Sequence, residues 1–348
     1  KENGVKKVFR ATLANGNYID FTDDHLVLSA PTREGEFSWN ELGTILGQKV
    51  QQSINTESAQ EKAIENPDSG TVQLLKSTEI EIAKAELSGW VAGDGYFGQY
   101  GKTTMFGVIT INEDEYEHVT GLFQKIFGSF TVSGRKEISP EYRIVRRDYK
   151  EVVKFVEEYG LDKNCLTASV PKKIFESPSD AQRAFLRALF QADGCVRIRN
   201  EDGRNSGDVV LTTISQDLAH QVQNLLLNNG IYSRVSLCED SREDRHLQYH
   251  VEIAYYSERL KFQSLIGFIS EEKKSKLEFL NASIIGKRKR PVSLETVSQI
   301  EYLGEETVYD IQTESGKFLA NGVVVHNCFI QSLKDDLVND GGIFNLVT

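Results

Sequence analysis

The chain lacks long hydrophobic runs, paired cysteines and an excess of positive charge. Its 348 residues contain no run of about 18 apolar residues and no secretory signal pattern, so we expect a cytoplasmic protein with no membrane segment. The four cysteines are far apart and form no Cys-x-x-Cys pair, which argues against a zinc ribbon or a disulfide framework. A hydrophobic content of 39% and a charged content of 26% are typical of globular domains, and the length allows two or three.

The net charge of −11 would disfavour binding to nucleic acid if the charge were spread evenly along the chain. It is not spread evenly, because residues 76–290 contain equal numbers of basic and acidic side chains and both flanks are acidic. The charge of the whole chain therefore does not exclude a nucleic-acid-binding domain in the middle.

Three side chains that can do covalent chemistry follow the apolar run 323–325, namely His326, Asn327 and Cys328. An Asn amide can attack its own backbone carbonyl and cut the chain, and proximity makes such a step equivalent to roughly 10⁵ M or more of external nucleophile. The preceding His can give a proton to the departing amine, and the Cys thiol can accept an acyl group. The alternative is a core strand ending in a turn, because Asn favours turns and Cys is often buried.

Residues 307–328, TVYDIQTESGKFLANGVVVHNC, resemble the C-terminal splicing block of inteins, which ends in His-Asn followed by Cys, Ser or Thr. The resemblance implies protein splicing, in which Asn327 cyclises and an acyl group is transferred to Cys328. Many inteins have another His about ten residues before that Asn, and this chain has none there. We therefore expect Asp310 or a water molecule to transfer the proton.

Thr22 and His25 have the Thr-x-x-His spacing that, by the same resemblance, polarises the amide at the upstream splice junction. Alone, this spacing also fits a surface loop. Together with the C-terminal block it indicates a mainly-β Hint-type splicing fold made from residues 1–50 and 291–327. Inteins begin with Cys or Ser, whereas this chain begins at Lys1, so we expect a fold that is incomplete at its N-terminus and a partner segment that supplies the missing block.

A helical pattern occurs twice, about a hundred residues apart. The first copy, residues 79–94, follows a capping box formed by Thr78 and Glu81. The second has Ser177 as its N-cap and Pro178 at its first helical position, and it ends at Asp193. Each copy is followed by two strands, an amphipathic helix, two strands and another helix, so each half is predicted to be αββαββα.

These patterns predict a multidomain chain in which the splicing fold is interrupted by an α+β domain of two pseudo-symmetric repeats. Residues 76–176 form the first predicted repeat and residues 177–290 the second. Residues 51–75 are polar and contain an Asn-Pro-Asp-Ser-Gly turn sequence, which predicts a linker. Residues 328–348 lie beyond the splicing block and would be a C-terminal flank, or extein.

Both repeat helices carry pairs of small residues four positions apart: Gly89 with Gly93, and Ala188 with Ala192. Such pairs allow two helices to approach closely, which would bring Asp94 and Asp193 together at the C-terminal ends. That position is unfavourable by roughly 0.3–1 kcal/mol per charge from the helix dipole alone. A divalent cation would reverse the effect, since Mg²⁺ binds one or two carboxylates together with waters and phosphate oxygens. The alternative is that each Asp-Gly only ends a helix, with glycine as the left-handed residue.

The two helices resemble the motifs of single-chain LAGLIDADG homing endonucleases, and the resemblance covers about residues 76–290. It implies a site-specific, metal-dependent DNA endonuclease, monomeric and pseudo-two-fold symmetric, in which Asp94 and Asp193 are catalytic and bind Mg²⁺ or Mn²⁺. Splicing would need no cofactor. The sixth motif position departs from the family pattern, with Ala92 in one copy and Gln191 in the other.

Strands with alternating arginines are expected to contact double-stranded DNA, because β-ribbons can lie in the major groove. Arg143, Arg197 and Arg199 are the candidates for base or phosphate contacts, although arginines on a solvated sheet face give the same pattern. The resemblance also implies a basic residue near each acid, and three lysines are candidates: Lys173, Lys273 and Lys274.

Residues 328–348 resemble a stretch of adenosylcobalamin-dependent ribonucleotide reductase, which implies that the intein is inserted in that enzyme. Two other interpretations remain. In one, the splicing element carries a catalytically inactive, DNA-binding remnant of the endonuclease. In the other, the chain is a maturase-like RNA-binding protein built on the same repeat and does not splice.

Overall fold

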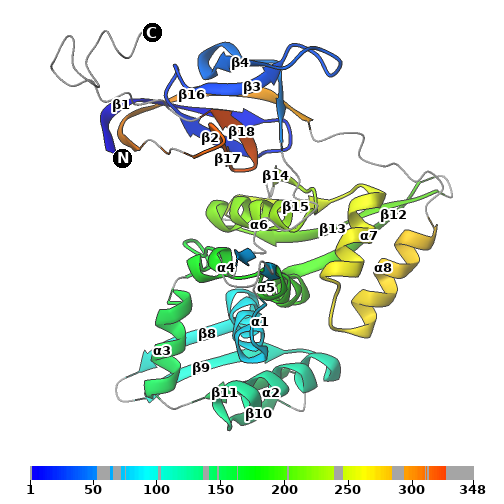
Figure 1. Ribbon diagram of the computed structural model, residues 1–348. Helices are drawn as coiled ribbons and strands as arrows, with labels where there is room; N and C mark the ends of the chain where they lie inside the picture. The colour runs from blue at the N-terminus through cyan, green and yellow to red at the C-terminus, as the bar shows by residue number, and fades with distance from the viewer. Residues whose placement is uncertain are drawn as a thin grey trace. The chain divides into compact units, whose positions relative to one another are not determined.

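The computed structural model describes residues 2–52, 63–65, 72–74, 76–100, 103–135, 141–146, 149–162, 164–201, 204–238, 246–283, 294–309, 311 and 313–326. Asp310, Asn327, Cys328 and the predicted extein 328–348 lie outside these ranges. The chain divides into two compact units, drawn in Figure 1. Unit 1 contains Lys1–Ala14, Tyr18–Ser53 and Leu294–Thr348, and unit 2 contains Asn15–Asn17 and Ile54–Ser293.

Unit 1 is built on an eight-stranded sheet with the strand order β17-β18-β3-β5-β16-β1-β2 and with β4 paired to β3. Its strands are β1 (Glu2–Leu13), β2 (Tyr18–Phe21), β3 (Leu26–Ala30), β4 (Ser38–Glu41), β5 (Lys49–Gln51), β16 (Leu294–Tyr309), β17 (Lys317–Ala320) and β18 (Val323–His326), and a short 3-10 helix spans Leu42–Thr44. Strands from the two ends of the chain alternate in this sheet, so neither end could form it alone.

The core of unit 1 is small and aliphatic. Period-two alternation buries Val323 and Val325 of β18, while Val324 and His326 between and after them stay half-buried. Val325 pairs with Val27 of β3. This pairing fixes His326 on the face of the strand opposite the buried valines.

Unit 2 contains two copies of one α/β plan. The first copy comprises α1 (Glu79–Asp94), β8 (Gly95–Tyr100), β9 (Thr103–Thr110), α2 (Glu113–Phe127), β10 (Thr131–Arg135), β11 (Glu141–Arg146) and α3 (Tyr149–Tyr159). The second comprises α5 (Ser179–Asp193), β12 (Gly194–Glu201), β13 (Arg204–Thr213), α6 (Gln216–Asn228), β14 (Arg234–Cys238), β15 (Gln248–Ile253) and α7 (Tyr256–Leu265). The predicted element order αββαββα is confirmed in both.

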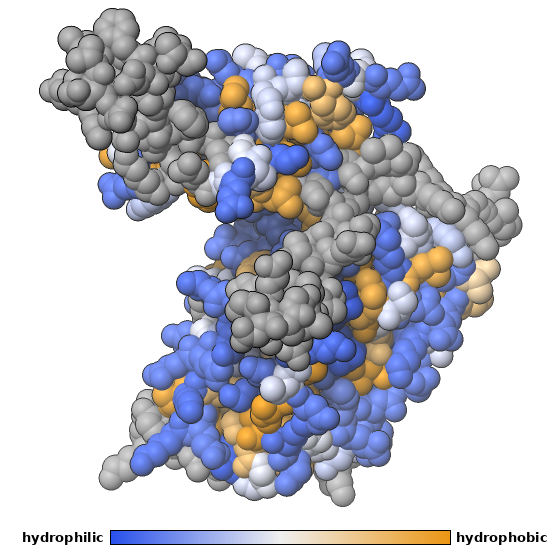
Figure 2. Space-filling model, in the orientation of Figure 1, coloured by the Kyte–Doolittle hydropathy of each residue, from blue (hydrophilic) through white to orange (hydrophobic). Residues whose placement is uncertain are grey.

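The two four-stranded sheets of unit 2 have equivalent orders, β10-β11-β9-β8 and β14-β15-β13-β12. Each sheet packs one face on its helices around a shared core, which includes Trp90 and Phe106 in the first repeat and Phe190 and Phe262 in the second. Apolar residues are scattered among hydrophilic ones on the face that Figure 2 shows. None of the helices in the described part of the chain is long and apolar enough to cross a membrane.

Four elements of unit 2 were not expected from the sequence. Helix α4 (Lys172–Glu176) precedes α5, and α8 (Glu271–Ser283) follows α7. Within the predicted linker, β6 (Ala63–Glu65) pairs with β7 (Val72–Leu74). A polar composition did not reveal this small sheet, because two strands of three residues leave almost no periodic signal.

The start of α5 differs from the prediction by one residue. Pro178 is the N-cap and Ser179 the first helical residue. Ser177 instead ends α4, since its N–H donates to the carbonyl of Ile174 and its hydroxyl to that of Lys173. The predicted capping box of Thr78 and Glu81 is confirmed at the start of α1.

A buried carboxylate joins the two repeats. Glu86 of α1 lies 2.8 Å from the guanidinium of Arg187 on α5 and 3.0 Å from Nε2 of His118 on α2. Burial by itself would raise the pKa of Glu86, but the hydrogen bonds from His118 and Arg187 outweigh burial and lower it. The ion pair between Glu86 and Arg187 thus holds α1 against α5, in addition to the apolar contacts between the two helices.

Candidate functional site

Helices α1 and α5 pack along each other at the centre of unit 2 (Figure 1). A Cβ added to Gly89 would lie 2.3 Å from the carbonyl oxygen of Phe185, and one added to Gly93 would lie 2.5 Å from the Cβ of Ala192. No side chain fits at either position. The predicted close approach of the two helices through their small residues is therefore confirmed.

This packing places Asp94 and Asp193 at the last positions of α1 and α5. The carboxylate of Asp193 would lie 3.3 Å from a Cβ on Gly93, one residue before Asp94. The two acids are thus neighbours across the helix pair. Both keep access to solvent, so a ligand can reach them.

The glycines after the acids are not left-handed helix caps. Gly95 and Gly194 both have φ −91°, an extended conformation that any residue adopts. After each acid the backbone instead turns back against the helix that precedes it. A Cβ added to Gly95 would lie 2.3 Å from the Cα of Val91, and one added to Gly194 would lie 2.5 Å from the carbonyl oxygen of Phe190. The cap interpretation is wrong, and the glycines are required by this close approach.

The acids are held where ionisation is disfavoured. Burial and the negative charge of Asp94 together raise the pKa of Asp193 to about 6, against the opposing effect of Lys273. Burial also raises the pKa of Asp94, with a contribution from the charge of Glu115. In such an environment, a bound cation would stabilise the ionised carboxylates most strongly.

Of the three candidate lysines, only Lys273 lies at the acid pair. Its ammonium donates to the backbone carbonyl of Gln191. Burial lowers the pKa of Lys273, while the charges of Glu115 and the two aspartates raise it. Lys173 pairs instead with Glu158 at 2.6 Å, and Lys274 with Glu271, also at 2.6 Å.

The oxygen atoms at this site fit a hard divalent cation. In the part of the chain that the structure describes, no group of three or more His, Cys, Asp or Glu residues is placed to hold a metal ion. Mg²⁺ needs no such group, because it commonly takes one or two carboxylates and completes its shell with waters and phosphate oxygens. Asp94 and Asp193 supply that pair.

The arginine candidates lie on the two sheets. Arg143 of β11 is exposed, and Arg197 and Arg199 lie two residues apart on β12, on one face of that strand. Arg197 contacts Asp208 at 2.6 Å and Glu252 at 2.5 Å, while Arg199 contacts Asp208 at 3.2 Å. Local carboxylates therefore neutralise the charge of Arg197 more completely than that of Arg199.

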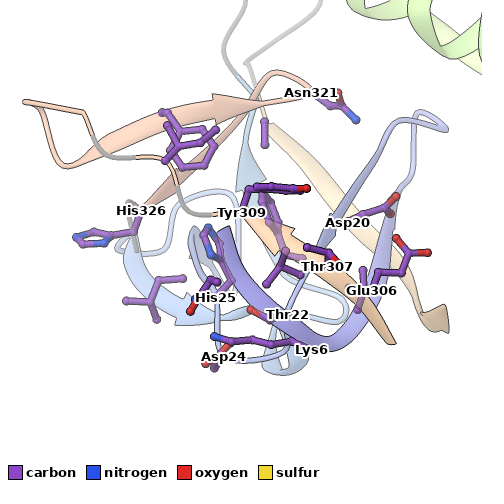
Figure 3. Close-up of a pocket in the computed structure, with 18 of the residues that line it drawn as sticks. Lys6, Asp20, Thr22, Asp24, His25, Glu306, Thr307, Tyr309, Asn321 and His326 are labelled. Atoms are coloured by element: carbon purple, nitrogen blue, oxygen red, sulfur yellow. The ribbon is translucent and has the colours of Figure 1, made fainter. Parts of the chain in front are cut away.

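A second candidate site is a cavity of about 840 Å³ in unit 1 (Figure 3). Its lining comes from both ends of the chain and includes Thr22, His25, Thr307, Tyr309 and His326. Thr22 and His25 form the tight turn between β2 and β3, in which the N–H of His25 donates to the carbonyl of Thr22 at 3.1 Å. The predicted Thr-x-x-His pair is thus a structured turn that borders the cavity.

The two histidines at this cavity are held by aromatic side chains. The ring of His25 stacks on Phe21, with centroids 4.2 Å apart, and makes an edge contact with Phe318 at 6.4 Å. The ring of His326 makes an edge contact with Trp39 at 5.0 Å and points away from that of His25 in Figure 3. Both imidazoles therefore border one cavity.

The comparison with family models identifies one part of this architecture. Residues 180–267 match the model of the LAGLIDADG-like domain. The match begins in α5 and ends after α7, so it covers most of the second repeat, including Asp193.

Two relatives align with more of the chain. The DNA polymerase of Thermococcus litoralis is 28% identical over 345 residues, covering 92% of this chain and 19% of the polymerase. The ribonucleoside-diphosphate reductase NrdEB subunit alpha of Bacillus subtilis is 29% identical over 190 residues, covering 50% of this chain and 17% of the reductase. This chain spans less than a fifth of the length of either relative.

Among solved structures, the homing endonuclease I-DmoI in complex with DNA and Mn aligns with a TM-score of 0.40 and 17% sequence identity. The alignment covers 54% of this chain and 98% of that one.

Proposed function

We propose that unit 2 is a site-specific DNA endonuclease that uses Mg²⁺ or Mn²⁺. The Asp94–Asp193 pair carries the proposal, because two like charges at the ends of packed helices lower stability unless a cation binds them. The LAGLIDADG-like match to residues 180–267 supports it. When bound, the cation would supply a Lewis acid that neutralises charge on a phosphodiester.

The protein side chains at this site have separate tasks. Asp94 and Asp193 would each offer one carboxylate to the cation. Lys273 holds a positive charge beside them, where it stabilises the negative charge that builds up on the phosphate. Because burial lowers the pKa of Lys273, this lysine also gives up a proton more readily than an exposed one.

The sheets provide the DNA-binding surface in this proposal. Arg143 and Arg199 are exposed and therefore better placed for phosphates than Arg197, which is half-buried and contacts two carboxylates. Phosphate contacts set most of the affinity, so the arginines govern binding and the acids govern cleavage.

The test uses plasmids with randomised inserts, incubated with purified protein and Mg²⁺, with the cut ends mapped by sequencing. Asp94→Asn and Asp193→Asn should each abolish cleavage and leave DNA affinity in Ca²⁺ within about tenfold of wild type, because binding rests on phosphate contacts. Lys273→Met should slow cleavage, and Lys274→Met is its matched control. Cleavage by the Asp94→Asn/Asp193→Asn double variant would refute the assignment.

Two other results would select the alternatives. Tight binding of DNA by wild type without any cleavage supports an inactive remnant. Preference for structured RNA over DNA supports a maturase-like role.

We further propose that unit 1 is a protein-splicing domain of the Hint type. The observation that favours it is the shared cavity, because Thr22 and His25 from the start of the chain border the same space as His326 from its end. In this proposal Thr22 and His25 polarise an upstream amide, and His326 protonates the amine that leaves when Asn327 cyclises. Asp310 stays a candidate for the remaining proton transfer.

The relatives support an inserted element. A DNA polymerase and a ribonucleotide reductase share no activity, yet each matches this chain over less than a fifth of its own length. Residues 328–348 would then belong to the host protein, and we propose that the host is a ribonucleotide reductase.

Mass spectrometry of the incubated chain tests the splicing proposal. Wild type should release the peptide that begins at Cys328. Asn327→Ala should stop the release, because alanine has no amide to cyclise, and His326→Ala should slow it. Release at the wild-type rate from the Asn327→Ala variant would contradict the proposed chemistry.

A further inference from the structure

Gln191 departs from the LAGLIDADG pattern and is almost fully buried, with 1% of its surface exposed. Its side-chain amide makes four hydrogen bonds. Nε2 donates to Oε1 of Glu115 at 2.7 Å and to Oγ of Ser270 at 3.0 Å. Oε1 accepts from the backbone N–H groups of Ile269 at 2.8 Å and Ser270 at 3.1 Å. Both donor hydrogens and both acceptor sites of the amide are thus satisfied.

These bonds connect three elements around the acid pair. Gln191 lies on α5, two residues before Asp193, and Glu115 lies in the first turn of α2 in the other repeat. Ile269 and Ser270 form the segment that leads into α8, whose first turn carries Lys273. The ammonium of Lys273 returns to the backbone carbonyl of Gln191.

The far end of α8 has its own attachment. The buried guanidinium of Arg259 on α7 donates to Oδ1 of Asn281 at 3.0 Å and to the carbonyl oxygen of Gly207 at 3.0 Å. Loss of the Gln191 bonds should therefore loosen the start of α8 and leave the rest of the helix in place.

The first repeat has no equivalent amide, since Ala92 stands at the corresponding position of α1. The lysine that precedes α5, Lys173, pairs with Glu158. Lys273, the candidate lysine at the acids, therefore lies on the segment that Gln191 holds, whereas Lys173 does not.

We propose that Gln191 is a positioning residue, whose amide fixes the start of α8 so that Lys273 is held against the Asp94–Asp193 pair. The proposal deepens the proposed endonuclease function and rests on it for its consequence in catalysis. All four hydrogen bonds of the Gln191 amide go to protein groups. A shift of about 1 Å in a catalytic group can cost on the order of 10²-fold in rate, so a residue of this kind governs turnover more than binding.

The first experiment measures position without activity, in metal-free protein. Gln191→Met should speed hydrogen exchange at the N–H groups of Ile269 and Ser270, because both lose their acceptor. It should also raise acylation of Lys273 relative to Lys274, which serves as an internal reference. The matched control is Gln182→Met, since Gln182 is a fully buried glutamine on the same helix that donates to Ser177 O at 2.9 Å.

The control should lose stability without changing exchange at residues 269–270 or the Lys273 to Lys274 labelling ratio. Equal effects of Gln191→Met and Gln182→Met on both readouts would overturn the proposal. Loss of any buried amide on α5 would then loosen residues 269–270 and Lys273 to the same extent.

The second experiment measures cleavage. Gln191→Met should lower kcat by about 10²-fold with little change in KM or in DNA affinity in Ca²⁺. Gln191→Glu should do the same, because it sets a carboxylate against that of Glu115. The exchange variant Glu115→Gln/Gln191→Glu restores one amide and one carboxylate across the contact and should recover most of the rate.

The Glu115→Gln/Gln191→Glu variant could return hydrogen exchange at the N–H of Ser270 to its slow wild-type rate without recovering the rate of cleavage. That result would refute the link from Gln191 to catalysis. If wild type cleaves no DNA, the endonuclease proposal fails, and the measurements on metal-free protein still decide whether Gln191 positions Lys273.

Discussion

Replacing Asp193 by asparagine should stabilise the metal-free protein. Asp193 lies at the C-terminal end of α5 beside Asp94, and burial and the neighbouring charge raise its pKa from 3.8 to about 6. At neutral pH the folded state therefore carries an ionised carboxylate where ionisation is unfavourable. Asparagine keeps the shape of the side chain and removes that charge.

The size of the effect follows from the pKa shift. A shift of about two units corresponds to up to about 3 kcal/mol at 1.36 kcal/mol per unit. Because Asp193 keeps solvent access, screening reduces this to ~1 kcal/mol. As pH falls through about 6, the folded state takes up a proton that the unfolded chain does not take up until near 3.8. The advantage of Asp193→Asn should thus be full above pH 6 and vanish below about pH 4.

Urea unfolding with a chelator, at intervals between about pH 4 and pH 8, measures this difference. Asp180→Asn is the control at the opposite end of α5, where the carboxylate accepts hydrogen bonds from the N–H of Ser77 at 3.1 Å and its hydroxyl at 2.7 Å. It should destabilise by ~1 kcal/mol, since a carboxylate in the first turn is favourable. Saturating Mg²⁺ should stabilise wild type more than Asp193→Asn.

The reasoning fails if Asp193→Asn lowers the free energy of unfolding at neutral pH, or if its advantage persists unchanged at pH 4. Equal stabilisation of wild type and variant by Mg²⁺ would separately remove Asp193 from the cation site.

Other substitutions give distinct expectations. Gly93→Ala should cost about 2 kcal/mol or more by urea unfolding, because its Cβ would lie 2.5 Å from that of Ala192. Glu86→Gln should destabilise by about 1–3 kcal/mol near neutral pH, and since the folded-state pKa of Glu86 is lowered, the difference should shrink as pH falls below its unfolded value of 4.5. Arg143→Ala should weaken DNA binding and reduce the salt slope by about 1. Arg197→Ala should change affinity less, and equal losses for the two arginines would contradict this ranking.

Much of unit 2 was accessible from the sequence because its signals are local. A capping box needs only Thr78 and Glu81, and its geometry is set within one helical turn. The repeat was visible because the same spacing of small residues and Asp-Gly recurs, and close helix packing is the steric consequence of that spacing. The position of Asp94 and Asp193 side by side followed from it.

Other features depended on contacts between distant segments. Nothing local distinguishes Lys273 from Lys173 or Lys274, and only the packing of α8 on the second repeat brings it to the acids. The glycine after Asp94 fits a helix cap in sequence, whereas its backbone shows that close approach is the reason for it.

The sequence by itself determined the elements, the repeat and the residue types that carry chemistry, because helix caps, periodicity and motif spacing act within a few residues. The tertiary structure decided which charges act on which. It neutralised Arg197 with Asp208 and Glu252, and it gave Gln191 partners about 76–79 residues away along the chain. Such pairings depend on how distant segments meet in the folded core, and no local spacing encodes them.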